Sequence, residues 1–379
     1  MRRGVSIDSR TVKKGELFIP IKGKNFDGRD FIPQARKKGA LILETRNGLK
    51  SLQQIAAAHR AKFDIPVIGI TGSSGKTTTK DMLASILAQE MKVLKTEENL
   101  NNEIGVPLTL LKLKKSHQAA VIEMAMQGKG EIALLADLAR PRIAIITNIG
   151  EAHLEHLKSE RNIALAKAEI LKYCRCAILP EDDKYFKLLK KKAPKGCKII
   201  PFGITKIGVN EKFIKALPLP GRHNVYNALA AIKAAKLLHI RPASIIKGLK
   251  HFKPSSQRME FIERKDGVRI INDSYNANPS SMRAALMVLA TQLADRRIAV
   301  LGDMLELGRK SKFYHKQTLD FAKKLGIDLI LTKGKEFAKV DRSSVLSSRF
   351  LRSLKSGDVV LVKGSRGMKM EEIVDSLRF

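Results

Sequence analysis

Short apolar runs alternate with helical patterns from about residue 65 onward. The first alternating region closes with a helical stretch over 224–238, where alanine and leucine recur. Its expected strands are 66–71, 119–124, 143–147, 177–179 and 198–202. Short apolar strands separated by helices are typical of a mostly parallel sheet with helices on both faces. We therefore expect an α/β domain in this part of the chain.

A second alternation begins near residue 252. Its expected strands are 268–272, 297–301, 329–332 and 359–362, and its expected helices are 280–293, 311–325, 344–354 and a last one from Met370. This pattern predicts a second α/β domain. The residues before 65 form short mixed segments with turn signals at 22–28. The chain as a whole is therefore expected to form three domains, at 1–64, 65–251 and 252–379.

A glycine-rich segment, IGITGSSGKTTT over 68–79, leads from the first apolar run into a helical pattern. Small residues allow backbone N–H groups to converge on phosphate oxygens, and the following helix adds its positive end. Lys76 is expected to reach the β- and γ-phosphates, and the Thr77 hydroxyl to bind Mg²⁺. The ATP-binding residues predicted in this loop are Gly72, Ser73, Ser74, Gly75, Lys76, Thr77 and Thr78.

Further polar positions follow apolar runs and are expected at the same edge of the sheet. Glu123 lies at the end of the run at 119–124, where a carboxylate suits Mg²⁺ bound together with phosphates. Asn148 and His153 follow the run at 143–147. Lys167 comes a little later, and its local sequence alone predicts a lysine on the surface of a helix.

The order of these motifs resembles the Mur ligase family along nearly the whole chain. Ile70 replaces the first glycine of a strict Walker motif, and the loop has the T-G-x-x-G-K-T form of the Mur and folylpolyglutamate ligases. The segment SIDSRTVKKGELF at 6–18 is similar to the one that holds the uridine nucleotide. The segment NIGEAHL at 148–154 is similar to a further motif of the family.

The resemblance implies roles for single residues. Lys167 would be carbamylated and position a second Mg²⁺, and His153 would be a metal ligand. Asn224, in GRHN, matches the asparagine that contacts adenine, and Arg258, in QRME, matches the arginine that reaches the γ-phosphate from the third domain. Asp273 matches the acidic residue that closes over the nucleotide. The implied metal-binding residues are Thr77, Glu123, His153 and Lys167, and the implied catalytic residues are Lys76, His153, Lys167 and Arg258.

Four stretches resemble the family members that add D-alanyl-D-alanine: NLNNEIGVP (99–107), SYNANP (274–279), LGDMLELG (301–308) and VKGSRGMKM (362–370). The resemblance implies an ATP-dependent ligase that joins D-Ala-D-Ala to UDP-MurNAc-tripeptide through an acyl phosphate in peptidoglycan synthesis. The implied α/β fold has a UDP-sugar-binding first domain, a central P-loop parallel-sheet ATPase domain and a C-terminal Rossmann-like domain for the dipeptide. The implied substrate-binding residues are Ser9, Arg10, Asn101, Asn102, Tyr275, Asn276, Asn278, Ser365 and Arg366.

The chain also differs from the family pattern. The first domain ends early, and the stretch between Gly203 and Gly221 lacks strands that relatives carry. Residues 123–129 read EMAMQGK, where the family has Glu-Met-Gly followed by an asparagine–histidine pair. Two other hypotheses therefore stay open: another amino-acid ligase of the Mur or folylpolyglutamate type, and a catalytically reduced paralogue that binds its ligands without turnover.

Composition adds few constraints. The 71 basic and 37 acidic residues give a net charge of +34, but the lysines are spread along the chain, and 5% aromatic residues with no tryptophan offer few base-stacking groups. We therefore expect no nucleic acid partner. No apolar run approaches the roughly 18–20 residues of a membrane span. Cys174, Cys176 and Cys197 lack the spacing of a metal site and are expected to be incidental thiols. We expect a cytoplasmic monomer.

Overall fold

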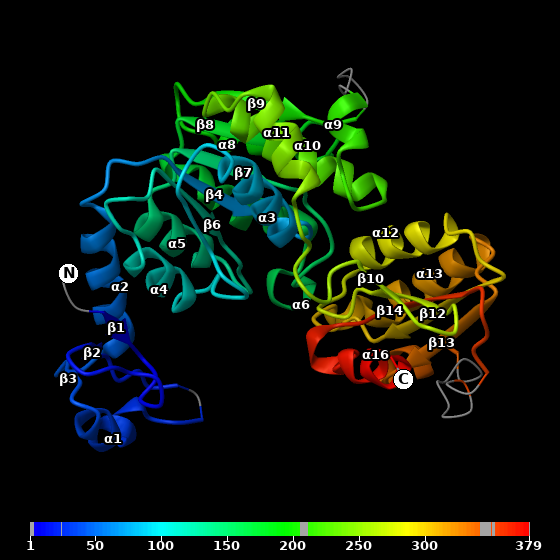
Figure 1. Ribbon diagram of the computed structural model, residues 1–379, viewed down its shortest axis with the longest axis horizontal. Coiled ribbons are helices and arrows are strands. Elements are labelled where there is room, and N and C mark those ends of the chain that lie inside the picture. The colour runs from blue at the N-terminus through cyan, green and yellow to red at the C-terminus, as the bar shows by residue number, and fades with distance from the viewer. Residues whose placement is uncertain (1–3, 24, 205–210, 342–349, 351–352, 379) are drawn as a thin grey trace.

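Three sheets follow one another along the chain (Figure 1). The structure is a computed structural model that describes residues 4–23, 25–204, 211–341, 350 and 353–378. The fold is the expected three-part α/β architecture with parallel sheets. No helix within these described ranges is long and apolar enough to cross a membrane.

The first sheet is small and parallel, with the order β1 (Val5–Ser6), β2 (Leu17–Phe18) and β3 (Leu41–Ile42). The sequence pattern did not predict these strands, because two residues are too few to show an alternation. A short 3-10 helix, η1 (Gly28–Phe31), leads into α1 (Ile32–Lys37). Val12, Phe18 and Ala35 form a core of their own beneath this sheet.

Helix α2 (Gly48–Arg60) joins the first sheet to the central domain. Asn47 caps its N-terminus by accepting a hydrogen bond from the backbone N–H of Lys50. The helix packs on α4 (Gly105–Leu111) and α5 (Glu131–Ala139) of the central domain. Its last turn is tied there by His59 Nε2 at 3.0 Å from the Leu113 carbonyl and by Arg60 Nε, which donates to the Ala139 carbonyl. The first domain is therefore fastened to the second through a packed helix rather than through a bare linker.

The central sheet has six parallel strands in the order β5-β6-β4-β7-β8-β9. Five lie where the sequence predicted strands, and the sixth, β5, is only three residues long. Every residue of β4, β6 and β7 is buried, because helices cover both faces of the sheet. The bounds are β4 (Val67–Thr71), β5 (Val93–Lys95), β6 (Ala119–Glu123), β7 (Ile143–Ile146), β8 (Cys176–Pro180) and β9 (Lys198–Phe202).

The strand order reverses at β4, which pairs with β6 on one side and β7 on the other. Ligands of open α/β sheets bind in the crevice at such a reversal, beyond the carboxyl ends of the strands. The covering helices are α3 (Lys76–Leu87), α4 (Gly105–Leu111), α5 (Glu131–Ala139), α6 (Leu154–Leu157), α7 (Glu160–Ala168), η2 (Glu169–Tyr173), α8 (Phe186–Lys192), α9 (Glu211–Lys215), α10 (Arg222–Leu237) and α11 (Pro242–Lys250).

The third sheet has the order β10-β11-β14-β12-β13 and is parallel except for β10, which runs antiparallel to β11. The sequence did not predict β10, whose residues alternate between half-buried and exposed. The strands are β10 (Glu260–Glu263), β11 (Arg269–Asn272), β12 (Arg296–Gly302), β13 (Leu329–Lys333) and β14 (Asp358–Lys363). The helices are α12 (Pro279–Ala290), η3 (Gly308–Lys310), α13 (Ser311–Lys324), α14 (Lys335–Ala338), η4 (Arg366–Met368) and α16 (Glu371–Leu377). Most of the helix predicted at 344–354 lies outside the described residues.

A close contact between two helices of the central domain, at Gly248, generates a stability prediction. A Cβ at Gly248 in α11 would lie 2.4 Å from the Cα of Ile86 in α3, so the backbones of the two helices meet there without a side chain between them. Gly248→Ala is expected to lower the free energy of unfolding by about 1–3 kcal/mol through overpacking. Urea unfolding followed by circular dichroism would measure this, with Lys247→Ala, an exposed position on the same helix, as the control. Equal stability of the two variants would contradict this packing.

Candidate active site

A cavity of about 970 Å³ lies between the central and third domains. Residues of both domains line it, so neither domain forms it alone. The predicted site residues that line it are Ser73, Ser74, Gly75, Lys76, Thr77, Thr78, Asn101, Asn102, Glu123, His153, Asn224, Arg258, Asp273, Tyr275, Asn276, Asn278, Ser365 and Arg366.

The glycine-rich loop follows β4 directly and turns into α3. Gly72 has φ +155°, and a Cβ there would lie 1.8 Å from Oγ1 of Thr147, so only glycine fits. Asn148 holds the next turn, because its Oδ1 accepts hydrogen bonds from the backbone N–H groups of Ser73 (3.1 Å) and Ser74 (2.9 Å). The loop is thereby shaped as a phosphate cradle at the N-terminus of α3.

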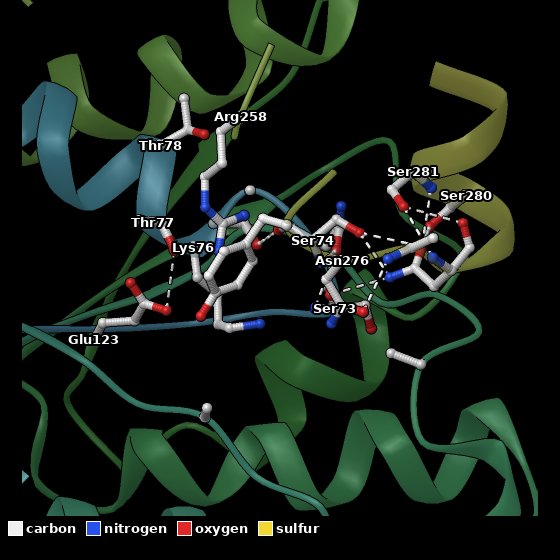
Figure 2. A pocket seen from close by; sticks show the side chains of 18 of the residues that line it. Ser73, Ser74, Lys76, Thr77, Thr78, Glu123, Arg258, Asn276, Ser280 and Ser281 are labelled. Atoms are coloured by element: carbon white, nitrogen blue, oxygen red, sulfur yellow. Dashed lines mark hydrogen bonds between the residues drawn. The ribbon is translucent and has the colours of Figure 1, made fainter. Parts of the chain in front are cut away.

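Glu123 has the features of a ligand for a hard cation. Its Oε1 accepts hydrogen bonds from Thr77 Oγ1 at 3.2 Å (Figure 2) and from Asn101 Nδ2 at 2.9 Å. Its Oε2 is buried and has no hydrogen-bond partner. Nζ of the buried Lys80 lies 3.9 Å from this oxygen, an ion pair without a hydrogen bond. A buried carboxylate oxygen without a hydrogen bond is costly, and Mg²⁺ with phosphate oxygens and water would satisfy it. The donor set therefore fits Mg²⁺ held together with a nucleotide.

The described residues contain no group of three His, Cys, Asp or Glu side chains suited to hold a metal by themselves. This is the expected pattern for Mg²⁺, which keeps several waters and is usually bound by one or two carboxylates plus substrate phosphates.

Lys167 is buried behind the glycine-rich loop, with 1% of its surface exposed. The prediction of a helix-surface lysine, made from its local sequence, is wrong, because the side chain is buried and reaches the backbone of Gly72. Lys167 Nζ donates to the Gly72 carbonyl at 2.9 Å, and Lys76 Nζ donates to the same oxygen at 2.9 Å. Burial lowers the pKa of Lys167 well below its usual range, and the nearby charge of Lys76 lowers it further. Burial therefore favours the neutral form of the Lys167 amine.

His153 stands immediately before α6, on the side of the cavity that meets the third domain. Its Nδ1 lies 2.5 Å from Oε2 of Glu306, which belongs to the loop after β12. Burial lowers the pKa of His153, although the hydrogen bond to Glu306 opposes this. Glu306 was not among the predicted site residues, because nothing in its local sequence shows that its loop reaches the central domain.

Arg258 reaches the cavity from the segment that links the central and third domains, and Figure 2 shows it beside Lys76. Its guanidinium carbon lies 4.1 Å from the centre of the Tyr275 ring. The guanidinium of Arg366 lies near the same ring, at 5.7 Å. Tyr275 therefore supports two cationic side chains at the mouth of the phosphate loop.

Asp273 is occupied by contacts within the third domain. Its Oδ1 accepts a hydrogen bond from the backbone N–H of Met259, and its Oδ2 accepts one from Nζ of Lys363 at 2.5 Å. Lys363 is buried and also donates to the Asn276 carbonyl at 2.9 Å. The sequence reasoning missed Lys363, although it lies in the VKGSRGMKM stretch. This ion pair holds the residue after Arg258 in place.

Asn278 joins the third domain to the phosphate loop. Its side chain caps α12 by accepting from the Ser281 N–H, and its Nδ2 donates to Oγ of Ser74 at 3.1 Å. Ser280 and Ser281 lie at this junction (Figure 2). Asn102 likewise uses its side chain at a helix start, accepting from the N–H of Gly105. Their contacts with a substrate stay predictions.

The remaining predicted residues either lie outside the cavity or use their side chains in contacts within their own domain. Asn224 is buried in the cavity wall and donates to the Pro220 carbonyl at 2.7 Å. Ser9 and Arg10 do not line the cavity: Ser9 Oγ donates to Gln34, and Arg10 pairs with Asp8 in the first domain. Ser9 and Arg10 therefore lie outside the cavity between the central and third domains. Their contact with a nucleotide sugar stays a prediction.

The departure from the family pattern after Glu123 falls on the cavity wall, where Met126 and Gln127 both line it.

The cysteines do not line this cavity. All three are free thiols, and Sγ of Cys174 lies 3.5 Å from Sγ of Cys197. Burial raises the pKa of the Cys174 thiol, so it stays in the unreactive thiol form at neutral pH.

Comparison with known families gives matches along nearly the whole chain. Residues 3–97 match the Mur ligase family catalytic domain, residues 70–235 the Mur ligase middle domain, and residues 257–366 the Mur ligase glutamate ligase domain. The UDP-N-acetylmuramoyl-tripeptide--D-alanyl-D-alanine ligase of Bacillus subtilis is 38% identical, over 99% of this chain and 93% of the relative.

Solved structures agree with these matches. MurF from Acinetobacter baumannii superposes with a TM-score of 0.90 at 32% identity, covering 99% of this chain and 93% of that one. MurF ligase from Thermotoga maritima, solved in complex with ADP, has a TM-score of 0.87 at 27% identity, covering 99% and 97%. With a phosphate loop, a buried carboxylate and an arginine from the third domain converging on one cavity, these similarities show that the chain belongs to the Mur ligase family.

Proposed function

We propose that this protein is an ATP-dependent ligase that joins D-alanyl-D-alanine to UDP-N-acetylmuramoyl-tripeptide in peptidoglycan precursor synthesis. The observation that carries the proposal is the cavity shared by two domains, where Lys76, Glu123 and Arg258 surround the place for a triphosphate. The full-length relative that is 38% identical is named for this reaction, which supports the same substrates here. The three-domain arrangement supports separate places for the nucleotide sugar, ATP and the dipeptide.

The chain's residues can assist phosphoryl transfer by placing positive charge around the γ-phosphate. A carboxylate is a poor electrophile, so the tripeptide's terminal carboxylate first takes the γ-phosphoryl group and becomes an acyl phosphate. Lys76 from the loop and Arg258 from the segment that leads into the third domain would neutralise the charge that develops during this transfer. The amine of D-Ala-D-Ala then attacks the acyl carbon, and phosphate leaves with the bonding electrons.

Mg²⁺ would supply charge neutralisation and fix the orientation of the phosphate oxygens. Thr77 and Glu123 are the proposed protein ligands of one ion, because the Thr77 hydroxyl donates to Oε1 of Glu123 and Oε2 of the same carboxylate has no hydrogen-bond partner. His153 and carbamylated Lys167 are the proposed residues of a second site. Carbamylation requires a neutral amine, and burial of Lys167 favours that form.

Other assignments complete the proposal. Asn224 would contact adenine, Asp273 would close over the nucleotide, and the first domain would bind the UDP-sugar through the segment that holds Ser9 and Arg10. The third-domain residues at the cavity, Tyr275 among them, would receive the dipeptide. We further propose that the protein acts as a monomer in the cytoplasm, since one chain builds the whole cavity and the substrates are cytoplasmic compounds.

Phosphate release tests the proposed reaction. Purified protein with ATP, Mg²⁺ and UDP-MurNAc-tripeptide should release phosphate only when D-Ala-D-Ala is added, and the product mass should rise by that of the dipeptide less water. Lys76→Ala should abolish release while the protein stays folded. Binding of ATP without any turnover would favour a catalytically reduced paralogue, and turnover with a folate and glutamate instead would favour the other ligase class.

Carbamylation of Lys167 gives a second prediction. Protein in ¹³C-labelled bicarbonate should show a carbamate carbon signal that Lys167→Ala lacks, and that weakens as pH falls because the protonated amine does not react. Removal of bicarbonate should lower turnover, and adding it back should restore turnover. Lys172→Ala removes an exposed lysine nearby and should keep both effects. A signal that persists in Lys167→Ala would contradict the assignment.

The contact between Arg258 and the aromatic ring of Tyr275 gives a third prediction. Tyr275→Leu removes the aromatic face and is expected to lower kcat by about 2–30-fold, in line with the roughly 0.5–2 kcal/mol of a cation–π contact. Tyr275→Phe keeps the face and should stay near the unmodified protein. Steady-state kinetics would measure both. Equal losses in the two variants would instead point to the hydroxyl group.

A further inference from the structure

A contact between two domains is built around His153 and Glu306. The carboxylate of Glu306 meets Nδ1 of His153 at 2.5 Å, and the Glu306 carbonyl accepts a hydrogen bond from the backbone N–H of Glu155 at 3.0 Å. The short helix α6, which follows His153, packs against η3, which follows Glu306. Figure 1 shows α6 on the side of the central domain that faces the third domain.

Both residues hold an unusual backbone conformation. His153 has φ +59° and Glu306 has φ +62°, a left-handed region that glycine adopts more readily than other residues. Residues in this region are strained, and strain of this kind gathers where the surrounding structure holds a side chain in one direction. Here two strained residues from different domains aim their side chains at each other.

The third domain holds Glu306 firmly on its own side. The backbone N–H of Met304 donates to Nε2 of His315, and that of Leu305 donates to Oγ of Ser365, both at about 3 Å. Leu307 is buried on the other side of Glu306. The carboxylate is therefore presented by a fixed loop and not by a free surface chain.

A carboxylate at Nδ1 determines which ring nitrogen of a histidine can bind a metal. It retains the proton on Nδ1, so that the lone pair lies on Nε2, and it fixes the plane of the ring. Metal-binding histidines nearly always have such a partner on their other nitrogen. His153 and Glu306 both line the cavity next to the phosphate loop, so the ring held in this way lies at the candidate site.

We propose that Glu306 is a positioning residue for the metal-binding histidine, supplied by the third domain. It presents Nε2 of His153 for Mg²⁺ only when the third domain is seated against the central domain, so that domain seating and completion of the second metal site are one event. This inference rests on the proposed function, which gives His153 its metal.

Variants of Glu306 test the proposal. Glu306→Ala should raise the Mg²⁺ concentration for half-maximal turnover about tenfold or more, within the 10–100-fold range typical of such outer partners. Glu306→Gln, which keeps the shape and can still accept a hydrogen bond, should give a smaller rise. At saturating Mg²⁺, KM for the dipeptide should change less than twofold. Glu155→Gln is the matched control, since it removes an exposed carboxylate at the same junction and keeps its backbone hydrogen bond.

Binding of Mn²⁺, measured by electron paramagnetic resonance with a non-hydrolysable ATP analogue, gives a readout independent of turnover. Glu306→Ala should weaken one of the bound Mn²⁺ ions, and thermal unfolding should show that it is folded. Unchanged metal dependence and unchanged Mn²⁺ binding in both Glu306 variants would overturn the proposal. So would a loss of turnover without any change in metal binding. Absence of turnover in the unmodified protein would count against the proposed function, and Mn²⁺ binding would still decide the role of Glu306.

Discussion

The structure depends on one constraint: the carboxyl ends of the central parallel strands meet at a single edge, and the strand order reverses there at β4. The strands can be aligned in this way because β4, β6 and β7 are buried along their whole length. The phosphate loop leaves the end of β4, Glu123 ends β6, and Asn148 follows β7. The phosphate loop and the start of α3 are therefore hydrogen-bonded both to the end of β6, through Thr77 and Glu123, and to the segment after β7, through Ser73 and Asn148.

The charge balance of the site follows from this burial. Lys76 and Lys167 share one carbonyl oxygen, and burial lowers the pKa of both. Arg258 adds a further positive charge, and it lowers the pKa of Lys76. Glu123 contributes the opposing negative charge, and its Oε2 has no hydrogen-bond partner. Burying these charged groups costs free energy. Phosphate groups and a divalent cation that bind together would offset this cost.

The third domain contributes through residues that are aimed by its own interior. The pair of Asp273 and Lys363 holds the backbone next to Arg258, and Tyr275 supports the guanidinium. Asn278 both caps α12 and reaches the phosphate loop. Closing the third domain onto the second therefore brings in an already ordered set of groups, which costs little reorganisation during the reaction.

The sequence by itself determined the α/β class, most of the strands of the two larger sheets and the phosphate loop, because these depend on local periodicity and on glycine spacing. It also indicated Glu123, because a carboxylate at the carboxyl end of a strand in a sheet that also carries a phosphate loop lies where Mg²⁺ can bind together with phosphates. It did not predict the two-residue strands of the first domain or the half-exposed β10, whose patterns are too short or too mixed. Only the tertiary structure decided that Lys167 is buried against Gly72 rather than exposed, that Lys363 compensates Asp273, and that Glu306 meets His153. These contacts join residues 90 or more positions apart, and their energies come from desolvation and orientation that no local pattern contains.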